Sequence, residues 1–191
     1  IVTFFIAVMQ GGALNYNHPF IIICFIISII TFILFIIVEK KADEPMLDLD
    51  IFKSKLFSIS IFCSFLSFVA IFCLLMVNPF YLQYTMKYTP AFTGLLMMFY
   101  SVILTLAALF SGVLSDKIGS ELLILIGLIT MGIGFFLMTI LSISTPISVF
   151  LVLVAIIGFG AGLFQSPNNS LVMSTVSKDK LGIAGSVNAL V

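Results

Sequence analysis

The sequence predicts an all-α polytopic membrane protein, and three observations support this fold class. Of the 191 residues, 62% are hydrophobic and only 8% are charged, whereas a soluble domain has about 25% charged residues. The mean hydropathy is +1.33. The few charges separate long apolar runs that are continuous rather than alternating, and lipid tolerates only helices or closed barrels. These observations exclude a soluble enzyme, a nucleic-acid-binding protein and a disordered chain.

Charge and cysteine content narrow the possible functions further. Eight basic residues, all lysines, balance eight acidic ones, so the chain offers no basic surface for nucleic acid. The three cysteines, Cys24, Cys63 and Cys73, lie inside apolar runs and lack the spacing of metal ligands. We interpret them as small core or lipid-facing residues. No metal, no cofactor and no nucleic-acid partner is expected.

The gaps between charges define the predicted spans. Residues 20–38 contain no charge, and 19 residues rising about 1.5 Å each cover the roughly 30 Å hydrocarbon core. The run 122–177 is too long for one helix, and the Ser-Thr-Pro cluster at 142–146 divides it. The complete spans predicted in order are 20–38, 56–86, 88–115, 122–140 and 147–170, with partial spans at 1–9 and 183–191. Because the sequence begins with Ile1 and stops within an apolar run, we expect it to be a piece of a longer chain.

The segment 39–55 is the only long polar stretch. Apolar residues such as Met46, Leu49 and Phe52 are interleaved there with aspartate and lysine. A solvated loop would leave these apolar side chains in water, so we favour a short amphipathic segment lying at the cytoplasmic interface. The solvated loop is the alternative.

Lysine placement predicts the orientation. When the loops between the spans are numbered in order, seven lysines fall on one side, and only Lys87 falls on the other, together with His18. The positive-inside rule places the side with seven lysines in the cytoplasm. We therefore expect a multi-pass protein of the cell membrane whose charged loops are cytoplasmic.

The cluster at 112–119 carries the most informative pattern. It reads Gly-Val-Leu-Ser-Asp-Lys-Ile-Gly, and it ends one span and begins the next through a tight turn. Gly112 would let two helices approach closely, and Gly119 can adopt the positive φ that such a turn often needs. Asp116 is predicted to accept backbone N–H bonds at the start of the following helix. These residues are compatible with a turn that has only a structural role and with a functional loop.

Five patterns, taken together, resemble one transporter family. They are the Gly-x-Leu-x-Asp-Lys-x-Gly loop at 112–119, the Glu-Pro-Met-Leu-Asp-Leu-Asp-Ile-Phe segment at 44–52, Tyr-Leu-Gln at 81–83, Gly-Phe-Gly-Ala-Gly at 158–162 followed by Pro167, and Gly-Ile-Ala-Gly at 182–185. In order and spacing the chain resembles the major facilitator superfamily. Within that superfamily it is similar to the fourteen-span drug:proton antiporters of the EmrB/QacA type.

The resemblance implies a division of the chain and a partial helical bundle of the major facilitator type. Residues 1–38 would contain the end of one linker span and a complete linker span. Residues 39–55 would be the cytoplasmic amphipathic segment. Residues 56–191 would form the C-terminal transport bundle, with four complete spans and the start of a fifth.

The resemblance also assigns a role to the loop motif. In alternating access, two bundles rock about a central site, and Gly112, Asp116, Lys117 and Gly119 would form a cytoplasmic latch that holds a neighbouring helix end in one state only. The family pattern usually continues with basic residues after the second glycine. This sequence has Ser-Glu there, ending at Glu121, which weakens the expected cationic contact.

The activity implied by the resemblance is proton-coupled efflux of hydrophobic or amphipathic drugs. Membrane lipid, a small hydrophobic substrate and protons would be the partners. No Asp, Glu or His lies deep within a predicted span, so the proton-coupling site is expected in an N-terminal half outside residues 1–191. An antibiotic- or metabolite-specific exporter of the same superfamily is one alternative. A membrane-embedded sensor or enzyme, with its soluble part elsewhere, is the alternative from another class, although the spans offer only scattered Ser and Thr for catalysis.

Glycines mark the predicted helix-packing faces. Residues 158 and 162 have GxxxG spacing, which in a multi-span bundle favours packing within the chain over a dimer. The predicted packing glycines are Gly127, Gly132, Gly134, Gly158, Gly160 and Gly162.

A proline follows the second glycine group. Pro167 is predicted to kink its helix, and Asn168 and Asn169 are predicted to satisfy the freed carbonyls. Capping near the interface and a role in the transport pathway are both open interpretations of these residues.

A drug cavity is expected to be largely apolar and aromatic, with a few polar groups. Asn78 is the best single candidate, because an uncharged amide beside the helix break at Pro79 needs a partner. The candidates for the substrate pathway are Asn78, Tyr81, Gln83, Phe99, Tyr100 and Gln165.

Overall fold

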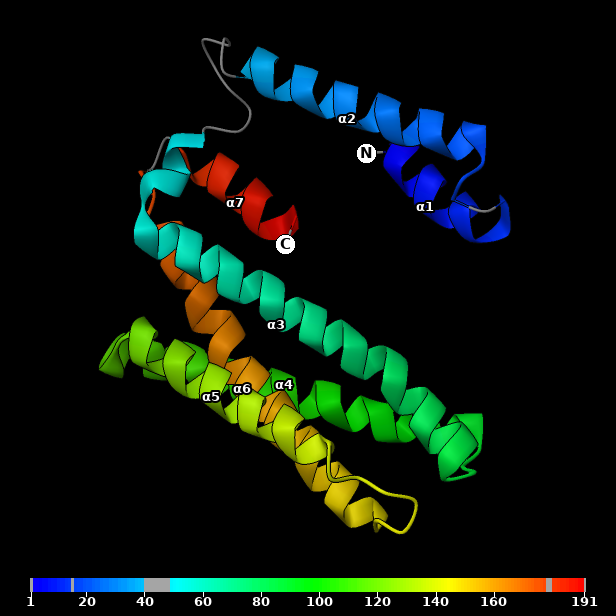
Figure 1. The fold of residues 1–191 in the computed structure, drawn as a ribbon. Helices are drawn as coiled ribbons and strands as arrows, with labels where there is room; N and C mark the ends of the chain where they lie inside the picture. Colours follow the sequence, from blue (N-terminus) through cyan, green and yellow to red (C-terminus); the bar gives the residue numbers. More distant parts are fainter. Residues whose placement is uncertain (1, 15, 40–48, 178–179, 191) are drawn as a thin grey trace. The chain divides into compact units, whose positions relative to one another are not determined.

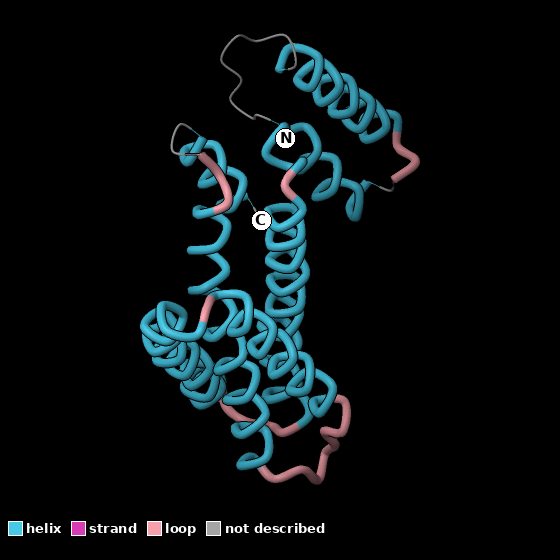
Figure 2. Tube along the Cα trace, turned by 90° about the vertical axis from the view of Figure 1, so that its left-hand side faces the viewer, coloured by secondary structure: helices cyan, strands magenta, loops and turns pink. Residues whose placement is uncertain are grey.

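The structure, a computed structural model, describes residues 2–14, 16–39, 49–177 and 180–190. Helices and loops account for these residues, and no strand occurs among them (Figure 1, Figure 2). The predicted all-α class is confirmed. The elements are α1 Val2–Leu14, α2 Pro19–Glu39, η1 Leu49–Lys53, α3 Lys55–Phe80, η2 Tyr81–Thr85, α4 Pro90–Ile118, α5 Ser120–Met138, α6 Ile147–Ser174 and α7 Leu181–Leu190.

Five helices in the described part of the chain are long and apolar enough to cross a membrane, and they correspond to the five predicted complete spans. The differences lie at the ends. α4 includes Asp116 and Lys117, and α5 includes Glu121, because charged residues at a helix end reach the interface and water. α6 continues past Pro167 to Ser174, where the sequence predicted an end near residue 170.

Residues 1–48 and 49–191 form two compact units. In the first unit, α1 packs on α2 through a small core of Ala7, Ile21 and Cys24. Phe4 and Phe25 meet edge to face, with their ring centroids 6.0 Å apart. Most other side chains of α2 are exposed, as expected for a span whose surroundings are lipid.

The second unit begins with η1, the described end of the polar stretch. Ile51 is buried, and the Phe52 ring meets the Phe57 ring edge to face at 5.4 Å. Ser54 then begins α3, because its side chain accepts a hydrogen bond from the backbone nitrogen of Phe57 at 3.4 Å. Residues 40–48 of the predicted amphipathic segment lie outside the described residues.

α3 ends in an unusual helical turn. Pro79 lies inside α3 and has no N–H to donate to the carbonyl one turn earlier. The helix continues as η2, a π-helical turn in which the backbone nitrogen of Met86 donates to the carbonyl of Tyr81 at 3.1 Å. A π turn of this kind breaks the regular ladder of hydrogen bonds and often occurs at functional sites.

α6 is the central helix of the second unit. α4 and α5 pack along it, and α3 also contacts it (Figure 1). In its apolar span 56% of the residues are buried, against 22–28% for α3, α4 and α5. The core, to which α3, η2, α4, α5 and α6 contribute, consists of Leu74, Leu82, Leu96, Tyr100, Met131, Phe150, Val154, Ile157 and Ala161.

A single residue joins α4 to α5. Gly119 has φ 91° and ψ 143°, a conformation that favours glycine, and its nitrogen donates to the carbonyl of Ser115 at 3.0 Å. The tight turn predicted from the sequence is confirmed. We call the ends of the helices near residue 119 the turn end, and the opposite ends, near the α5–α6 loop at 139–146, the loop end.

Candidate functional site

The contact between α5 and α6 is built on glycines. A Cβ atom added at Gly127 would lie 2.6 Å from the backbone nitrogen of Phe164, and one added at Gly160 would lie 2.6 Å from the backbone nitrogen of Met131. One added at Gly134 would lie 2.5 Å from a side-chain carbon of Ile157. At Gly127 and Gly160 no side chain would fit, so the two backbones touch directly, whereas at Gly134 the Ile157 side chain packs on the glycine. A Cβ atom added at Gly132, also predicted to pack, would meet no atom of the described residues within 4 Å, so for this part of the chain that prediction is wrong.

The contact between α4 and α6 combines glycines with a buried hydroxyl. A Cβ atom at Gly162 would lie 2.6 Å from the carbonyl oxygen of Leu104, and one at Gly158 would lie 3.1 Å from that of Tyr100. The hydroxyl of Ser111 donates to the carbonyl of Gly162 at 3.0 Å. The GxxxG pair at 158 and 162 therefore faces a helix of the same chain.

Gly112, the first glycine of the loop motif, extends the same contact toward the turn end. A Cβ atom added there would lie 3.4 Å from the hydroxyl oxygen of Ser166 on α6. The position is therefore adjacent to α6, as the close approach predicted from the sequence requires, and a small side chain would just fit.

The contact between α3 and α6 depends on an amide. Asn168, only 1% exposed, donates from its Nδ2 to the Ser64 hydroxyl at 2.7 Å and to the Ser60 carbonyl at 3.4 Å. Its Oδ1 has no partner among the described residues. Asn169 accepts a hydrogen bond from Asn188 of α7 at 3.1 Å. The prediction that both asparagines satisfy carbonyls freed by the neighbouring proline is wrong, because each bonds to another helix.

Asp116 does not cap α5. It lies in the last turn of α4, exposed, and makes no hydrogen bond or ion pair within the described ranges. No side chain caps the start of α5, and the hydroxyls of Ser115 and Ser120 instead lie 2.8 Å apart across the turn. The capping prediction is wrong because α4 continues two residues beyond Asp116, which leaves its carboxylate on the preceding helix.

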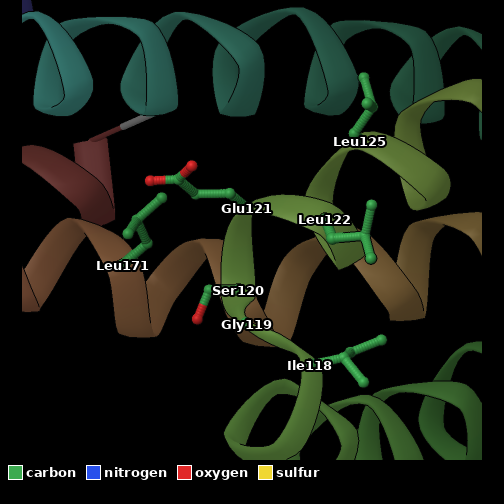
Figure 3. Close-up of a pocket in the computed structure, with 7 residues that line it drawn as sticks. All are labelled: Ile118, Gly119, Ser120, Glu121, Leu122, Leu125 and Leu171. Atoms are coloured by element: carbon green, nitrogen blue, oxygen red, sulfur yellow. The ribbon is translucent and has the colours of Figure 1, made fainter.

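The loop motif borders an open hollow of about 570 Å³ at the turn end (Figure 3). Figure 3 shows Glu121 extending from the start of α5 toward Leu171 on α6. Lys117 is exposed beside the turn. The hollow is lined by Ile118, Gly119, Ser120, Glu121, Leu122, Leu125 and Leu171. An acidic residue thus borders the hollow where the family pattern has basic ones.

The aromatic pathway candidates lie toward the loop end and differ in surroundings. The hydroxyl of Tyr81 donates to the carbonyl of Ser142 at 2.9 Å, and its ring stacks on Phe150 with centroids 6.0 Å apart. Tyr81 therefore fastens η2 to the α5–α6 loop. Tyr100 belongs to the core and is 4% exposed, whereas Phe99 is 37% exposed and belongs to the outer face of α4.

The polar pathway candidates do not gather into one cluster. Gln83 in η2 is half-buried, and Gln165 of α6 is half-buried near the turn end. Asn78 is 5% exposed and lines a separate hollow between α3 and α5. Its Nδ2, like the hydroxyls of Thr93 and Tyr100, has no hydrogen-bond partner in the described part of the chain.

Several polar residues in helix contacts were not predicted from the sequence. Three buried serines, Ser60, Ser64 and Ser67, lie on one face of α3. On α4, the buried Ser111 bonds to the Gly162 carbonyl of α6. Spacing of three and four residues was the available signal, since it places the three serines on one helix face. The described residues contain no group of three His, Cys, Asp or Glu side chains that could hold a metal ion.

Comparison with known proteins identifies the family. The model of the Major Facilitator Superfamily matches residues 1–191, which is the whole sequence. The chain belongs to the major facilitator superfamily. Its helices are therefore part of a bundle of that superfamily, and the partial-bundle prediction is confirmed.

Three relatives illustrate the similarity within the superfamily. The uncharacterized MFS-type transporter YhcA of Bacillus subtilis (strain 168) is 29% identical over 84% of this chain and 30% of its own length. The riboflavin transporter RibZ of Clostridioides difficile (strain 630) is 32% identical over 87% of this chain and 36% of its own. The multidrug transporter protein MdtP of Bacillus subtilis (strain 168) is 30% identical over 85% of this chain and 30% of its own length. The chain thus spans about a third of the length of these relatives.

Proposed function

We propose that this chain is part of a secondary active transporter that exports hydrophobic or amphipathic drugs in exchange for protons. The match of the superfamily model to all 191 residues carries the proposal. The similarity to MdtP, named as a multidrug transporter, supports the substrate class. The fourteen-span antiporter branch belongs to the same proposal, since the motif order resembles it. The chain acts as a carrier and not as an enzyme.

The proposed mechanism is alternating access, and the contacts within the bundle support it. The glycine contacts of α6 with α4 and α5 join three helices into one body that can move as a unit. The loop motif formed by Gly112, Asp116, Lys117 and Gly119 is the proposed latch at the turn end. Asp116 is exposed there and makes no hydrogen bond or ion pair with the described residues, and we propose that its carboxylate bonds to a helix outside residues 1–191.

The proposed orientation places the turn end in the cytoplasm of a multi-pass cell-membrane protein. Lysine placement supports this orientation, because Lys117 and six other lysines lie on the same side of the predicted spans. The proton-coupling group is proposed outside this chain, since the charge-free spans provide no ionisable acid or histidine at depth. The linker role of 1–38 and the bundle role of 56–191 belong to the same proposal.

Dye efflux tests the function. The gene that encodes this chain is expressed, and everted membrane vesicles are prepared. The vesicles are incubated with a fluorescent hydrophobic cation, with and without an imposed pH gradient, and the dye that accumulates inside them is measured. We expect accumulation that depends on the pH gradient and collapses when a protonophore is added. Accumulation equal to that of vesicles without the protein, across a broad panel of dyes, would refute multidrug export.

A metabolite-specific exporter is the second candidate. The 32% identity to RibZ, named as a riboflavin transporter, favours it. Such a carrier would move one metabolite well and would leave a panel of unrelated dyes untouched. The same vesicles, assayed with riboflavin and with the dye panel in parallel, separate the two functions.

A further inference from the structure

Two sides of α6 that other helices leave open differ in chemistry. Because successive residues of a helix are turned by about 100°, Val152, Phe159 and Ser170 share one side. Val152 is 57% exposed and Phe159 is 47% exposed, as expected of a side that meets lipid. Gln165 and Asn169, four residues apart, share a second side. Asn169 is exposed there and Gln165 is half-buried, so this side presents amides.

The amide side lies toward other helices and away from the lipid side. Gly162 faces α4, and Asn168 bonds to α3. The rotation of about 100° per residue places Gln165 and Asn169 between these two directions. Asn169 also bonds to Asn188 of α7. The amides therefore lie on a side of α6 that α3, α4 and α7 border, and Asn169 is nevertheless exposed.

The amides lie within the membrane-spanning part of the chain. The sequence has no charged residue from 122 to 177. At about 1.5 Å per residue, Asn169 lies about 8 Å and Gln165 about 14 Å before the end of α6. Asn188 lies about 10 Å beyond the start of α7. Amides at this depth require water or a hydrogen-bonding partner.

The bond between the two asparagines leaves one donor and one acceptor unused. The Nδ2 of Asn188 donates to the Oδ1 of Asn169 at 3.1 Å. The Nδ2 of Asn169 and the Oδ1 of Asn188 make no hydrogen bond with the described residues. Asn169 is an exposed residue, and the Oδ1 of Asn188 is not among the unpartnered atoms that the fold encloses. Both groups are therefore open to a small molecule.

We propose that Gln165, Asn169 and Asn188 line a water-filled passage that opens at the turn end, and that the two asparagines bind the amide group of a solute. The carbonyl of the solute accepts from Asn169, and its N–H donates to Asn188. The three side chains carry no charge, which suits a neutral polar group. This inference deepens the proposed function, on which it rests for the passage being a transport pathway.

Thiol labelling measures water access without transport. Gln165→Cys and Ser170→Cys are made in the full-length protein after its native cysteines are replaced by alanine. Open membrane fragments are treated with a charged methanethiosulfonate reagent, which reacts only with thiols in water. Ser170 lies about 8 Å nearer the turn end than Gln165, so depth alone would make its replacement react faster. We expect Gln165→Cys to react at least about tenfold faster, and both variants to react equally after denaturation.

A matched pair of solutes tests the asparagines. Naphthamide offers an acceptor and a donor, whereas acetonaphthone has the same size and offers only an acceptor. Naphthamide should half-protect Gln165→Cys at a concentration about threefold to tenfold lower, the difference that one hydrogen bond provides. Asn188→Ala should abolish this difference. Ser186→Ala should keep it, because that hydroxyl bonds within α7 to the Gly182 carbonyl at 3.0 Å. Asn169→Ala should raise the half-protecting concentrations of both solutes.

Two outcomes would overturn the inference. If Ser170→Cys reacts faster than Gln165→Cys, lipid or a helix outside residues 1–191 covers the amides, and there is no passage at this side. Equal protection of Gln165→Cys by both solutes would remove the role of the asparagines. The assay needs no gradient and no export, so protection in a protein that exports no dye would refute the proposed function and leave the asparagine site standing. Dye export with slow labelling of Gln165→Cys would do the reverse.

Discussion

α6 contacts α5 and α3 by different chemistry, and the difference separates a rigid contact from an adjustable one. Against α5, Gly127 and Gly160 bring two backbones together with no side chain between them. Against α3, the side chain of Asn168 donates one hydrogen bond to the Ser64 hydroxyl and one to the Ser60 carbonyl. A backbone contact cannot change without moving a whole helix, whereas a side-chain bond can break and form again in another position. We therefore expect α5 and α6 to move together and α3 to shift relative to them.

The largest expected effect comes from breaking the glycine contact. Gly127→Ala places a Cβ atom 2.6 Å from the backbone of α6 and should destabilise the protein by about 1–3 kcal/mol. Gly132→Ala, on the same helix, adds a Cβ atom with no described residue within 4 Å and should change the stability by less than about 0.5 kcal/mol. Thermal unfolding of the purified protein in detergent compares them. Equal melting temperatures for the two variants would contradict the close contact.

A double-mutant cycle tests the adjustable contact. Asn168→Ala and Ser64→Ala together should show a coupling energy of about 0.6 kcal/mol, the average for hydrogen bonds between membrane helices. Asn168→Ala combined with Ser67→Ala, a buried serine of the same helix face, should show almost none. Unfolding in mixed detergent measures both cycles. The interpretation fails if the Ser67 cycle is coupled as strongly as the Ser64 cycle.

The contact of α4 with α6 combines a close backbone approach with one side-chain hydrogen bond. Removing that bond alone should lower the stability less than breaking a glycine contact. Ser111→Ala removes the bond to the Gly162 carbonyl at 3.0 Å but keeps the close backbone approach, so we expect a loss of about 0.5 kcal/mol. Thr105→Val is the control, because Thr105 bonds within its own helix, to the Ser101 carbonyl at 2.8 Å. The same detergent unfolding assay applies, and a greater loss in the Thr105 variant would contradict the bridging role.

The smallest effect on stability, and a distinct effect on transport, is expected at the turn. Asp116→Asn should leave the melting temperature unchanged, since Asp116 has no partner in the described residues. It should slow dye efflux about twofold to fivefold if the carboxylate stabilises one state of the carrier by about 0.3–1 kcal/mol. Glu121→Gln neutralises a neighbouring carboxylate of the same turn and should transport at the original rate. Equal slowing in both variants, or in neither, would remove the latch.

The spans and the α4–α5 turn were predictable because their causes are local. A continuous apolar run and its flanking charges decide whether a segment crosses lipid, whatever the rest of the chain does. The positive φ of Gly119 follows from a one-residue connection between two helices. The ends of α4 and α6 were predicted less well, because charge gaps alone do not show that a helix continues past Asp116 or Pro167.

The partners of the polar residues were not predictable from local sequence. Asn168 and Asn169 are adjacent, yet one bonds to α3 and the other to α7. The unpartnered donor of Asn78 is likewise visible only when the neighbouring helices are in place. Sequence reasoning singled out Asn78 because an amide in a span needs a partner, but it gave no information on the hollow beside it.

By itself, the sequence determined the membrane class, the number and order of the spans and the tight turn, because the free energy of transferring a segment into lipid is a property of that segment. Only the tertiary structure decided which glycines pack. A Cβ atom at Gly127 would meet α6, whereas one at Gly132 would meet no described residue within 4 Å, although both glycines belong to α5. Five residues of a helix turn a position to a different face, and only the fold decides which face meets another helix.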